Sequence, residues 1–187
     1  MNLETKSTAL ILIDLQRGLV AGDLAPNSSD FVLANAAELA NKFRAIGGTV
    51  VLVRVSFAPD GADRLAQPVD QATAGKMADG WDELVPEIGP KPGDILIVKH
   101  QWGAFYGTSL DSQLRRRNID TIVLGGISTS IGVESTARDA YEHNYSVVLA
   151  VEAMTDRIPE AHQNSVSRIF PRLGRVRQTK DILAALV

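Results

Sequence analysis

The chain has 187 residues, 45% hydrophobic and 22% charged, a composition typical of one soluble globular domain, residues 1–187, with a full-sized core. A net charge of −3 argues against nucleic acid or an anionic membrane as the main partner, and the absence of cysteine excludes disulfides, thiolate zinc sites and cysteine catalysis. The first residues do not form a signal peptide, and no stretch approaches about 18 apolar residues, so we expect a cytoplasmic protein without a membrane span.

Short apolar runs rich in β-branched residues recur along the chain and predict strands. Continuous apolar runs of this kind are typical of parallel strands that are buried on both faces. The runs lie at residues 9–13, 50–55, 95–98, 121–124 and 147–151, with a weaker sixth at 175–177.

Amphipathic segments separate these runs and predict helices at residues 31–46, 110–118, 132–143, 159–170 and 181–186. Pro159 fits the first turn of its helix, and Thr179 is a plausible N-cap for the last helix. Alternation of strands and helices predicts right-handed βαβ units, and therefore an α/β fold with a parallel sheet covered on both faces.

Residues 57–92 form the longest stretch without a clear pattern. This stretch holds five of the eight prolines, and we expect a long connection with one helical turn near residues 81–84. Connections of this length usually serve a function or form an interface.

Polar residues or glycines end three of the predicted strands. Asp14 follows the first strand, Lys99 the third, and Gly126 ends the fourth. In open α/β sheets, ligands bind beyond the carboxyl ends of the strands where the strand order reverses, so these three ends can meet at one crevice. From position alone, Asp14 could equally bond turn amides, and Lys99 could point into water.

Three segments together resemble the isochorismatase-like hydrolases, also called the cysteine hydrolase superfamily. The resemblance implies a Rossmann-like three-layer sandwich with a six-stranded parallel sheet, forming a single domain over residues 1–187. Members are usually dimers or tetramers, so the resemblance also implies a homo-oligomer. The segments are "ALILIDLQRG", "VKHQWGAFYGTSLDSQLRRRNIDTIVLGGISTSIGVESTARDAYEHNYSVVLAVEAM" and "AHQNSV".

The resemblance also implies an Asp–Lys–Cys site, in which Asp14 matches the aspartate and Lys99 the lysine. The cysteine of the amidase members falls on Gly132, so the nucleophile position is empty here. Isochorismatases proper also carry glycine at this position, and they hydrolyse a vinyl ether without a covalent intermediate. The family further implies a cis peptide between Ile127 and Ser128.

The sequence departs from the metal-binding members of the family. Nicotinamidases bind a metal through an Asp-x-His pair after the second strand, where this chain has Arg54 and Ser56. None of the three histidines, His100, His143 and His162, has ligand spacing to another. We therefore expect no metal and no cofactor.

Candidate substrate contacts lie around the three strand ends. The backbone amides of Ile127, Ser128, Ile131 and Gly132 are candidates to hold a developing oxyanion. The aromatic residues after Lys99 predict a flat apolar wall for a small cyclic or planar ligand, or else core or interface packing. Arg17 is a candidate for the rim, and the candidates for direct substrate binding are Gln16, Trp102, Phe105 and Ser130.

Three functions are compatible with an empty nucleophile position. In the first, a hydrolase acts on a small molecule, with Asp14 as general acid or base, Lys99 stabilising charge and water attacking; vinyl ether hydrolysis is one such reaction. This requires burial of Asp14 to outweigh the lysine cation, which favours the ionised carboxylate.

In the second function, a hydroxyl near the turn replaces the thiol as nucleophile. Asp14 is then the only available base. Thr129 and Ser130 are better explained as N-caps of the following helix. The hydroxyls in question belong to Ser128, Thr129, Ser130 and Ser135. In the third, the chain is a catalytically inactive small-molecule-binding or assembly protein that retains the hydrolase fold.

Overall fold

The computed structural model describes residues 1–71 and 77–187 and contains one six-stranded sheet in which every pair of neighbours is parallel. The strand order is β3-β2-β1-β4-β5-β6, so the order reverses between β1 and β4. The strands are β1 (Thr8–Ile13), β2 (Thr49–Val55), β3 (Ile95–Lys99), β4 (Thr121–Ile127), β5 (Ser146–Thr155) and β6 (Arg175–Arg177).

Helices follow or precede the strands, and two short π-helical segments, η1 and η2, continue directly into α-helices. In chain order they are α1 (Arg17–Val20), α2 (Ser29–Ala45), α3 (Leu110–Arg115), η1 (Thr129–Val133), α4 (Glu134–Glu142), α5 (Pro159–Asn164), η2 (Ser165–Ile169), α6 (Phe170–Leu173) and α7 (Thr179–Ala185). No helix in the described part of the chain is long and apolar enough to cross a membrane.

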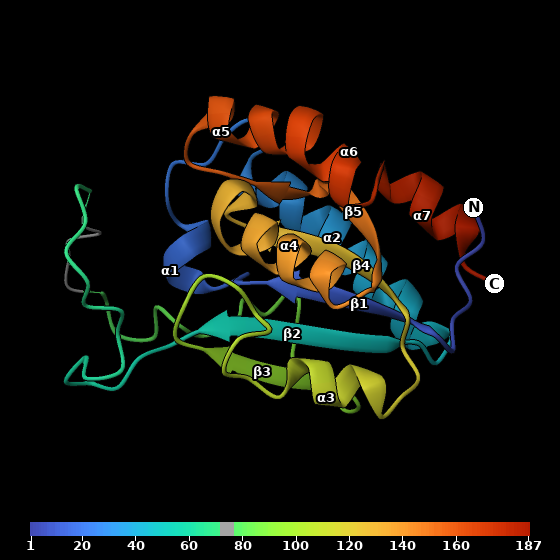
Figure 1. Ribbon diagram of the computed structural model, residues 1–187, viewed down its shortest axis with the longest axis horizontal. Helices are drawn as coiled ribbons and strands as arrows, with labels where there is room; N and C mark the ends of the chain where they lie inside the picture. The colour runs from blue at the N-terminus through green and yellow to red at the C-terminus, as the bar shows by residue number, and fades with distance from the viewer. Residues whose placement is uncertain (72–76) are drawn as a thin grey trace.

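The helices cover both faces of the sheet and create two apolar cores (Figure 1). Helices α2 and α7 pack on one face, while α3, α4 and α6 pack on the other. All six residues of β1 are buried, because this central strand has a neighbour on each side and helices above and below. The three-layer Rossmann-like sandwich expected from the sequence is therefore confirmed.

Glycine at the end of β4 allows that strand to approach β1 closely. Gly126 has a φ of 127°, and a Cβ at this position would lie 2.1 Å from the carbonyl oxygen of Ile13. Only glycine accommodates both the positive φ and this close approach. The ends of β1 and β4 therefore lie side by side where the strand order reverses, the usual ligand site of such sheets.

The structure corrects several predicted boundaries. The fourth and fifth strands extend to Ile127 and Thr155, beyond the apolar runs that marked them. Helix α1 was not predicted, because its four residues include none that is buried and so leave no apolar stripe. Thr179 is the first residue of α7 and not its cap, which is Gln178.

The connection between β2 and β3 is long. Residues 57–71 extend away from the sheet (Figure 1), whereas Val85 and Ile88 are buried in one of the cores. Residues 57–71 and 77–94 contain no helix or strand.

Near the predicted helical turn at residues 81–84 the backbone forms hydrogen-bonded turns, in which Trp81 N–H donates to Ala78 and Glu83 N–H to Gly80, each at 3.1 Å. Leu84 then forms an isolated antiparallel bridge with Gln16. Trp81 is half-buried and stacks on Phe57, with 5.9 Å between the ring centroids.

Candidate active site

Asp14 turns out of the sheet directly after β1. Its φ of 53° is left-handed, and its backbone N–H still donates to the carbonyl of Val53 at 2.9 Å. The side chain is 7% exposed, and its Oδ2 lies 2.7 Å from Nζ of Lys99. A buried carboxylate is thus paired with a buried ammonium group at the carboxyl edge of the sheet.

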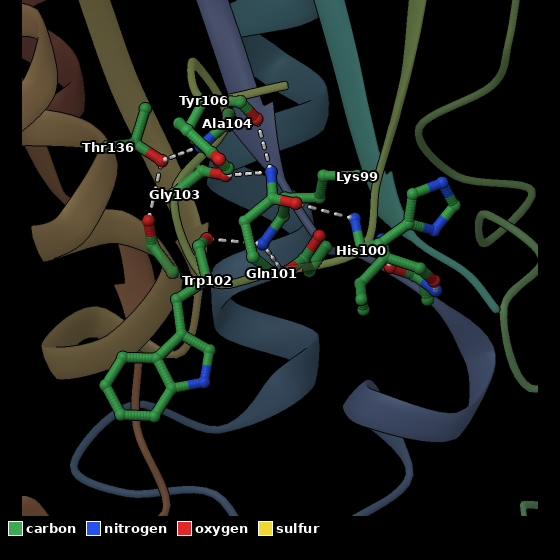
Figure 2. A network of polar contacts seen from close by, with 12 residues as sticks. Lys99, His100, Gln101, Trp102, Gly103, Ala104, Tyr106 and Thr136 are labelled. Carbon is green, nitrogen blue, oxygen red and sulfur yellow. Dashed lines mark hydrogen bonds and ion pairs between the residues drawn. The ribbon is translucent and has the colours of Figure 1, made fainter. Parts of the chain in front are cut away.

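Lys99 ends β3 and is only 2% exposed. Besides its ion pair with Asp14, Nζ donates to the carbonyl oxygen of Trp102 at 2.6 Å (Figure 2). An ammonium group has three N–H donors, and these two contacts use two of them. The lysine is therefore held by a carboxylate from β1 and by the loop that follows its own strand.

Burial governs the protonation of Asp14. It raises the pKa of the carboxyl from its ordinary 3.8 to about 6, although the charge of Lys99 and its hydrogen bond act in the opposite direction. Oδ1 is buried and has no hydrogen-bond partner in the described part of the chain. The requirement that burial outweigh the lysine cation is met, and protonated and ionised forms are both accessible near neutral pH.

Gly132 lies directly beside this pair. A Cβ at Gly132 would lie 3.3 Å from Oδ2 of Asp14 and 3.4 Å from Nζ of Lys99, with Cγ2 of Ile13 at 3.1 Å. The missing side chain would therefore point at the carboxylate and the ammonium group. The structure brings Asp14, Lys99 and Gly132 together, as expected from the sequence, and their catalytic roles stay predictions.

Gly132 belongs to η1, which begins immediately after the cis peptide between Ile127 and Ser128. The helix starts at Thr129, three residues earlier than predicted, so the interpretation of Thr129 and Ser130 as its N-caps is wrong. The hydroxyl of Thr129 is instead bonded to Nδ1 of His162 at 2.9 Å.

Two of the four candidate oxyanion residues, Ile131 and Ile127, already pair with other backbone groups. Ile131 N–H donates to the carbonyl of Ser128 at 3.2 Å, and Ile127 pairs in register with Thr155 of β5. We therefore keep Ser128 and Gly132 as the backbone candidates for stabilising a developing negative charge.

The candidate substrate contacts differ widely in accessibility. The amide of Gln16 is buried and bonds both backbone groups of Val55, at 2.9 and 2.8 Å, so we assign it a structural role. Phe105 is 6% exposed and belongs to one of the two cores, where its outer side stacks on the exposed ring of His143 with ring centroids 5.1 Å apart. Trp102 is 61% exposed, and its ring points away from the polar contacts around Lys99 (Figure 2).

Trp102 and the half-buried Ser130 therefore remain the candidate substrate contacts. Arg17 is exposed and forms an ion pair with Glu83 at 3.0 Å, consistent with a position at the rim.

The end of β2 has no metal-binding arrangement. Arg54 and Ser56 both contact Oδ2 of Asp82, at 2.9 and 2.5 Å. The described ranges contain no group of three or more histidine, aspartate and glutamate side chains placed to hold a metal ion. The absence of a metal in the working protein stays a prediction.

Sequence reasoning missed the side chains that hold the turn. Asp156 accepts from the backbone N–H of Ser130 at 2.7 Å, and the buried hydroxyl of Thr136 bonds the carbonyl of Gly132 at 2.7 Å. Asp156 directly follows β5 and Thr136 lies on α4, and no spacing in the sequence connects them to the strand ends. Thr136 and His162 both lie in segments that carried the resemblance, whereas Asp156 lies outside all three.

Fold and site together define a Rossmann-like α/β protein with a buried acid–amine pair beside a helix that begins at the strand-order reversal. A family model described as "Isochorismatase domain" matches residues 8–181. The chain is 49% identical to the isochorismatase family protein YecD of Escherichia coli O157:H7, over 100% of both proteins. It is 30% identical to the ureidoacrylate amidohydrolase RutB of Stutzerimonas stutzeri (strain A1501), over 87% of this chain and 75% of that protein.

A solved structure gives the same result. An isochorismatase family protein from Burkholderia thailandensis matches with a TM-score of 0.93 and 45% identity, covering 98% of this chain and 97% of that one. The chain therefore belongs to the isochorismatase family of hydrolases.

Proposed function

We propose that the protein hydrolyses a small molecule without forming a covalent intermediate. Asp14 is the general acid and base, Lys99 stabilises negative charge, and the attacking water occupies the space beside Gly132. The observation that carries this proposal is the open position at Gly132. A Cβ there would lie 3.3 Å from Oδ2 of Asp14 and 3.4 Å from Nζ of Lys99. An oxygen atom near that point is within reach of both groups.

The protonation of Asp14 supports its role in proton transfer. A general acid or base works best when its pKa lies near the operating pH, and burial places the pKa of Asp14 at about 6. Its buried Oδ1 lacks a donor within the described residues. A water molecule or a substrate hydroxyl can supply that donor.

Vinyl ether hydrolysis is the first reaction that we propose to test. Protonated Asp14 gives its proton to the terminal vinyl carbon, which leaves an oxocarbenium ion. Water adds to that ion and returns a proton to the carboxylate, and the resulting hemiketal breaks into a carbonyl compound and an alcohol. General acid–base catalysis of this kind typically contributes about 10² to 10⁴ in rate.

Amide hydrolysis is the second reaction to test, because one relative is named an amidohydrolase. Here the Asp14 carboxylate takes a proton from the water that attacks the carbonyl carbon, and we propose that the N–H groups of Ser128 and Gly132 stabilise the oxyanion. The C–N bond then breaks as Asp14 returns the proton to the leaving amine.

A substrate screen tests the proposal. Purified protein is assayed against isochorismate, other vinyl ethers and small amides, together with Asp14→Asn and the control Asp23→Asn, which makes the same change at an exposed site. We expect turnover that Asp14→Asn reduces at least about 100-fold and Asp23→Asn leaves unchanged. For a vinyl ether, kcat/KM should fall above about pH 6, since the protonated carboxyl is required.

Other outcomes would overturn the proposal. Turnover that persists in Asp14→Asn removes the assigned acid. A covalent adduct on Ser128, Thr129, Ser130 or Ser135, detected by mass spectrometry during turnover, replaces water with a hydroxyl nucleophile. Tight binding of a panel compound with no turnover of any compound favours the catalytically inactive binding protein.

A further inference from the structure

Thr136 makes two hydrogen bonds with one buried hydroxyl. Its Oγ1 donates to the carbonyl of Gly132 at 2.7 Å and accepts from the backbone N–H of Ala104 at 3.1 Å (Figure 2). The side chain is fully buried. A threonine on a helix commonly bonds the carbonyl four residues earlier, so the first contact is ordinary. The second contact joins α4 to a different part of the site.

Ala104 belongs to the loop of residues 100–107, which also holds Lys99. The carbonyl of Trp102 in this loop accepts from Nζ of Lys99 at 2.6 Å. The Gln101 side chain braces the loop, because its Nε2 donates to the carbonyls of Gly103 at 3.0 Å and Tyr106 at 2.6 Å (Figure 2). Movement of Ala104 would therefore be transmitted to the contact of Trp102 with the lysine.

The loop also packs tightly on α4. A Cβ at Gly103 would lie 2.7 Å from Oδ2 of Asp139, so only a residue without a side chain fits there unless that carboxylate moves. Glycine at this position lets the loop backbone come close enough for Ala104 to reach Thr136.

These contacts form a closed path around the proposed water position. The path runs from Nζ of Lys99 to Trp102, along the loop to Ala104 and through Thr136 to Gly132. It closes across the 3.4 Å between Nζ and the point that a Cβ would occupy at Gly132. Thr136 is the only side chain in that path other than the lysine itself.

We propose that Thr136 is a positioning residue that fixes the separation between the Lys99 ammonium group and the space beside Gly132. It does so by tying the loop that holds the lysine to the helix turn that carries the glycine. This inference rests on the proposed function, which assigns the attacking water to that space. The separation between the Lys99 ammonium group and position 132 can nevertheless be measured without turnover.

The absence of cysteine from the chain provides a specific probe. Gly132→Cys introduces one thiol beside Lys99 and Asp14, and its pKa follows from the pH dependence of its alkylation by iodoacetamide. A nearby ammonium group lowers the pKa of a thiol, while a nearby carboxylate raises it. Because Asp14 is the same in every variant compared, a change in this pKa reports movement of the Lys99 ammonium group relative to position 132.

The probe is compared alone and in combination with Thr136→Val, Thr136→Ser and the control Thr121→Val at the opposite end of β4. We expect Thr136→Val to raise the thiol pKa by about 1, which lowers the alkylation rate at pH 6–7 about tenfold. Thr136→Ser keeps the hydroxyl and should stay within about twofold of the parent, as should Thr121→Val. Gln101→Ala should act in the same direction as Thr136→Val, because it loosens the same loop.

A thiol pKa that Thr136→Val leaves unchanged overturns the proposal, as does a serine variant that behaves like the valine variant. If the cysteine or valine variants do not fold, the 15Nζ resonance of Lys99 in the native chain serves instead. It should move in Gln101→Ala and stay in place in Thr136→Ser, and the opposite pattern overturns the proposal. A failed substrate screen alters neither measurement, so the two proposals fail independently.

Discussion

Asp14 experiences two opposing influences on its carboxyl group. Removal from water favours the protonated form, while the ammonium group of Lys99 at 2.7 Å favours the ionised form. Burial is the larger influence, and the pKa rises to about 6. The acid is consequently stabilised in its neutral form in the folded protein relative to the unfolded chain.

The free energy of unfolding should depend on pH through Asp14. Below about pH 4 the carboxyl is protonated in both states, and between pH 4 and 6 the folded state binds more protons than the unfolded chain. The contribution of Asp14 to stability therefore falls as pH rises and is lost above about pH 6, a change of ~3 kcal/mol in total. Asp14→Asn cannot titrate and should lack this component.

Chemical denaturation of both proteins from pH 4 to pH 7 measures the effect. The free energy of unfolding of the parent minus that of Asp14→Asn should decrease over this range, and the exposed control Asp23→Asn should give a difference close to constant. A difference that rises with pH would mean that the lysine, and not burial, determines the pKa.

Gly132→Ala should separate folding from catalysis. The added Cβ occupies the proposed water position, 3.3 Å from Oδ2 of Asp14 and 3.4 Å from Nζ of Lys99. The contact with Cγ2 of Ile13 at 3.1 Å is tight, but alanine is favoured over glycine within helices by about 0.5–1 kcal/mol, so we expect little change in Tm. Turnover of the identified substrate should fall at least about 100-fold, as for loss of acid–base catalysis. Retained turnover in a well-folded variant would place the water elsewhere.

The residues that carry chemistry were predictable to different degrees. Asp14 and Lys99 follow apolar runs at strand ends, and the resemblance supplied the position of Gly132, so all three were identified from the sequence. Thr136 was not, because its role depends on a loop 32 residues away in the chain reaching the same helix. Phe105 and Gln16 were taken as substrate contacts because polarity and aromaticity do not reveal which way a side chain points.

At the scale of the elements, three polar ties fasten the η1–α4 segment to the segment after β5. Ser130 N–H donates to Asp156 at 2.7 Å, Thr129 bonds His162 at 2.9 Å, and Glu134 accepts from Ser165 at 2.6 Å. Burial lowers the pKa of His162, which favours the neutral ring. The turn that carries Gly132 is thus fixed by residues 156–165 as well as by the sheet.

Asp156→Ala should weaken this attachment. The carboxylate accepts from the backbone N–H groups of Ser130 and Arg157, at 2.7 and 2.8 Å, and is 3% exposed. Removing a buried acceptor leaves a buried donor unpaired and costs about 1–3 kcal/mol. We expect that loss in chemical denaturation, while Asp23→Ala, which removes an exposed carboxylate, should change stability by less than about 0.5 kcal/mol. Equal effects of the two variants would show that Asp156 does not hold the turn.

Element boundaries were predicted well where apolar residues recur in a regular pattern, and poorly where contacts with neighbouring elements extend a strand or helix. Apolar runs marked β1 to β5 and a weaker run marked β6, but β4 continues through Gly125 and Gly126, residues that have no strand propensity of their own. Helix α2 starts at Ser29, two residues before its predicted start, because Ser28 caps it by accepting from Phe31 N–H. Local sequence identifies the elements, while their neighbours decide where they end.

At the scale of the whole molecule, the parallel sheet brings the ends of distant segments to one edge. β1 lies between β2 and β4, so Asp14 sits within reach of Lys99 from β3 and of Gly132 after β4. This convergence follows from strand–helix alternation and was therefore predictable. The long connection between β2 and β3 was predictable only as an irregular segment, since its conformation does not come from a repeating pattern.

The connection between β2 and β3 exposes apolar side chains on which a second copy of the chain can pack. Its described residues 57–71 extend away from the sheet, and within them Leu65 is 70% and Val69 is 64% exposed (Figure 1). Burying each such side chain is favourable by about 1.5–3 kcal/mol, so a second copy of the chain can gain by covering them. We expect a dimer or tetramer in light scattering coupled to size-exclusion chromatography.

The doubly substituted Leu65→Ser, Val69→Ser protein should weaken that association by about 100-fold or more, because it removes both apolar contacts. Dilution during chromatography should then release monomers, whereas the nearby polar control Gln67→Ser should keep the parent's assembly. Neither substitution touches the two cores, so Tm measured at a concentration where both proteins are monomeric should be unchanged. A parent that is monomeric at every concentration would contradict this prediction, and an unchanged assembly in the double variant would place the interface elsewhere on the molecule.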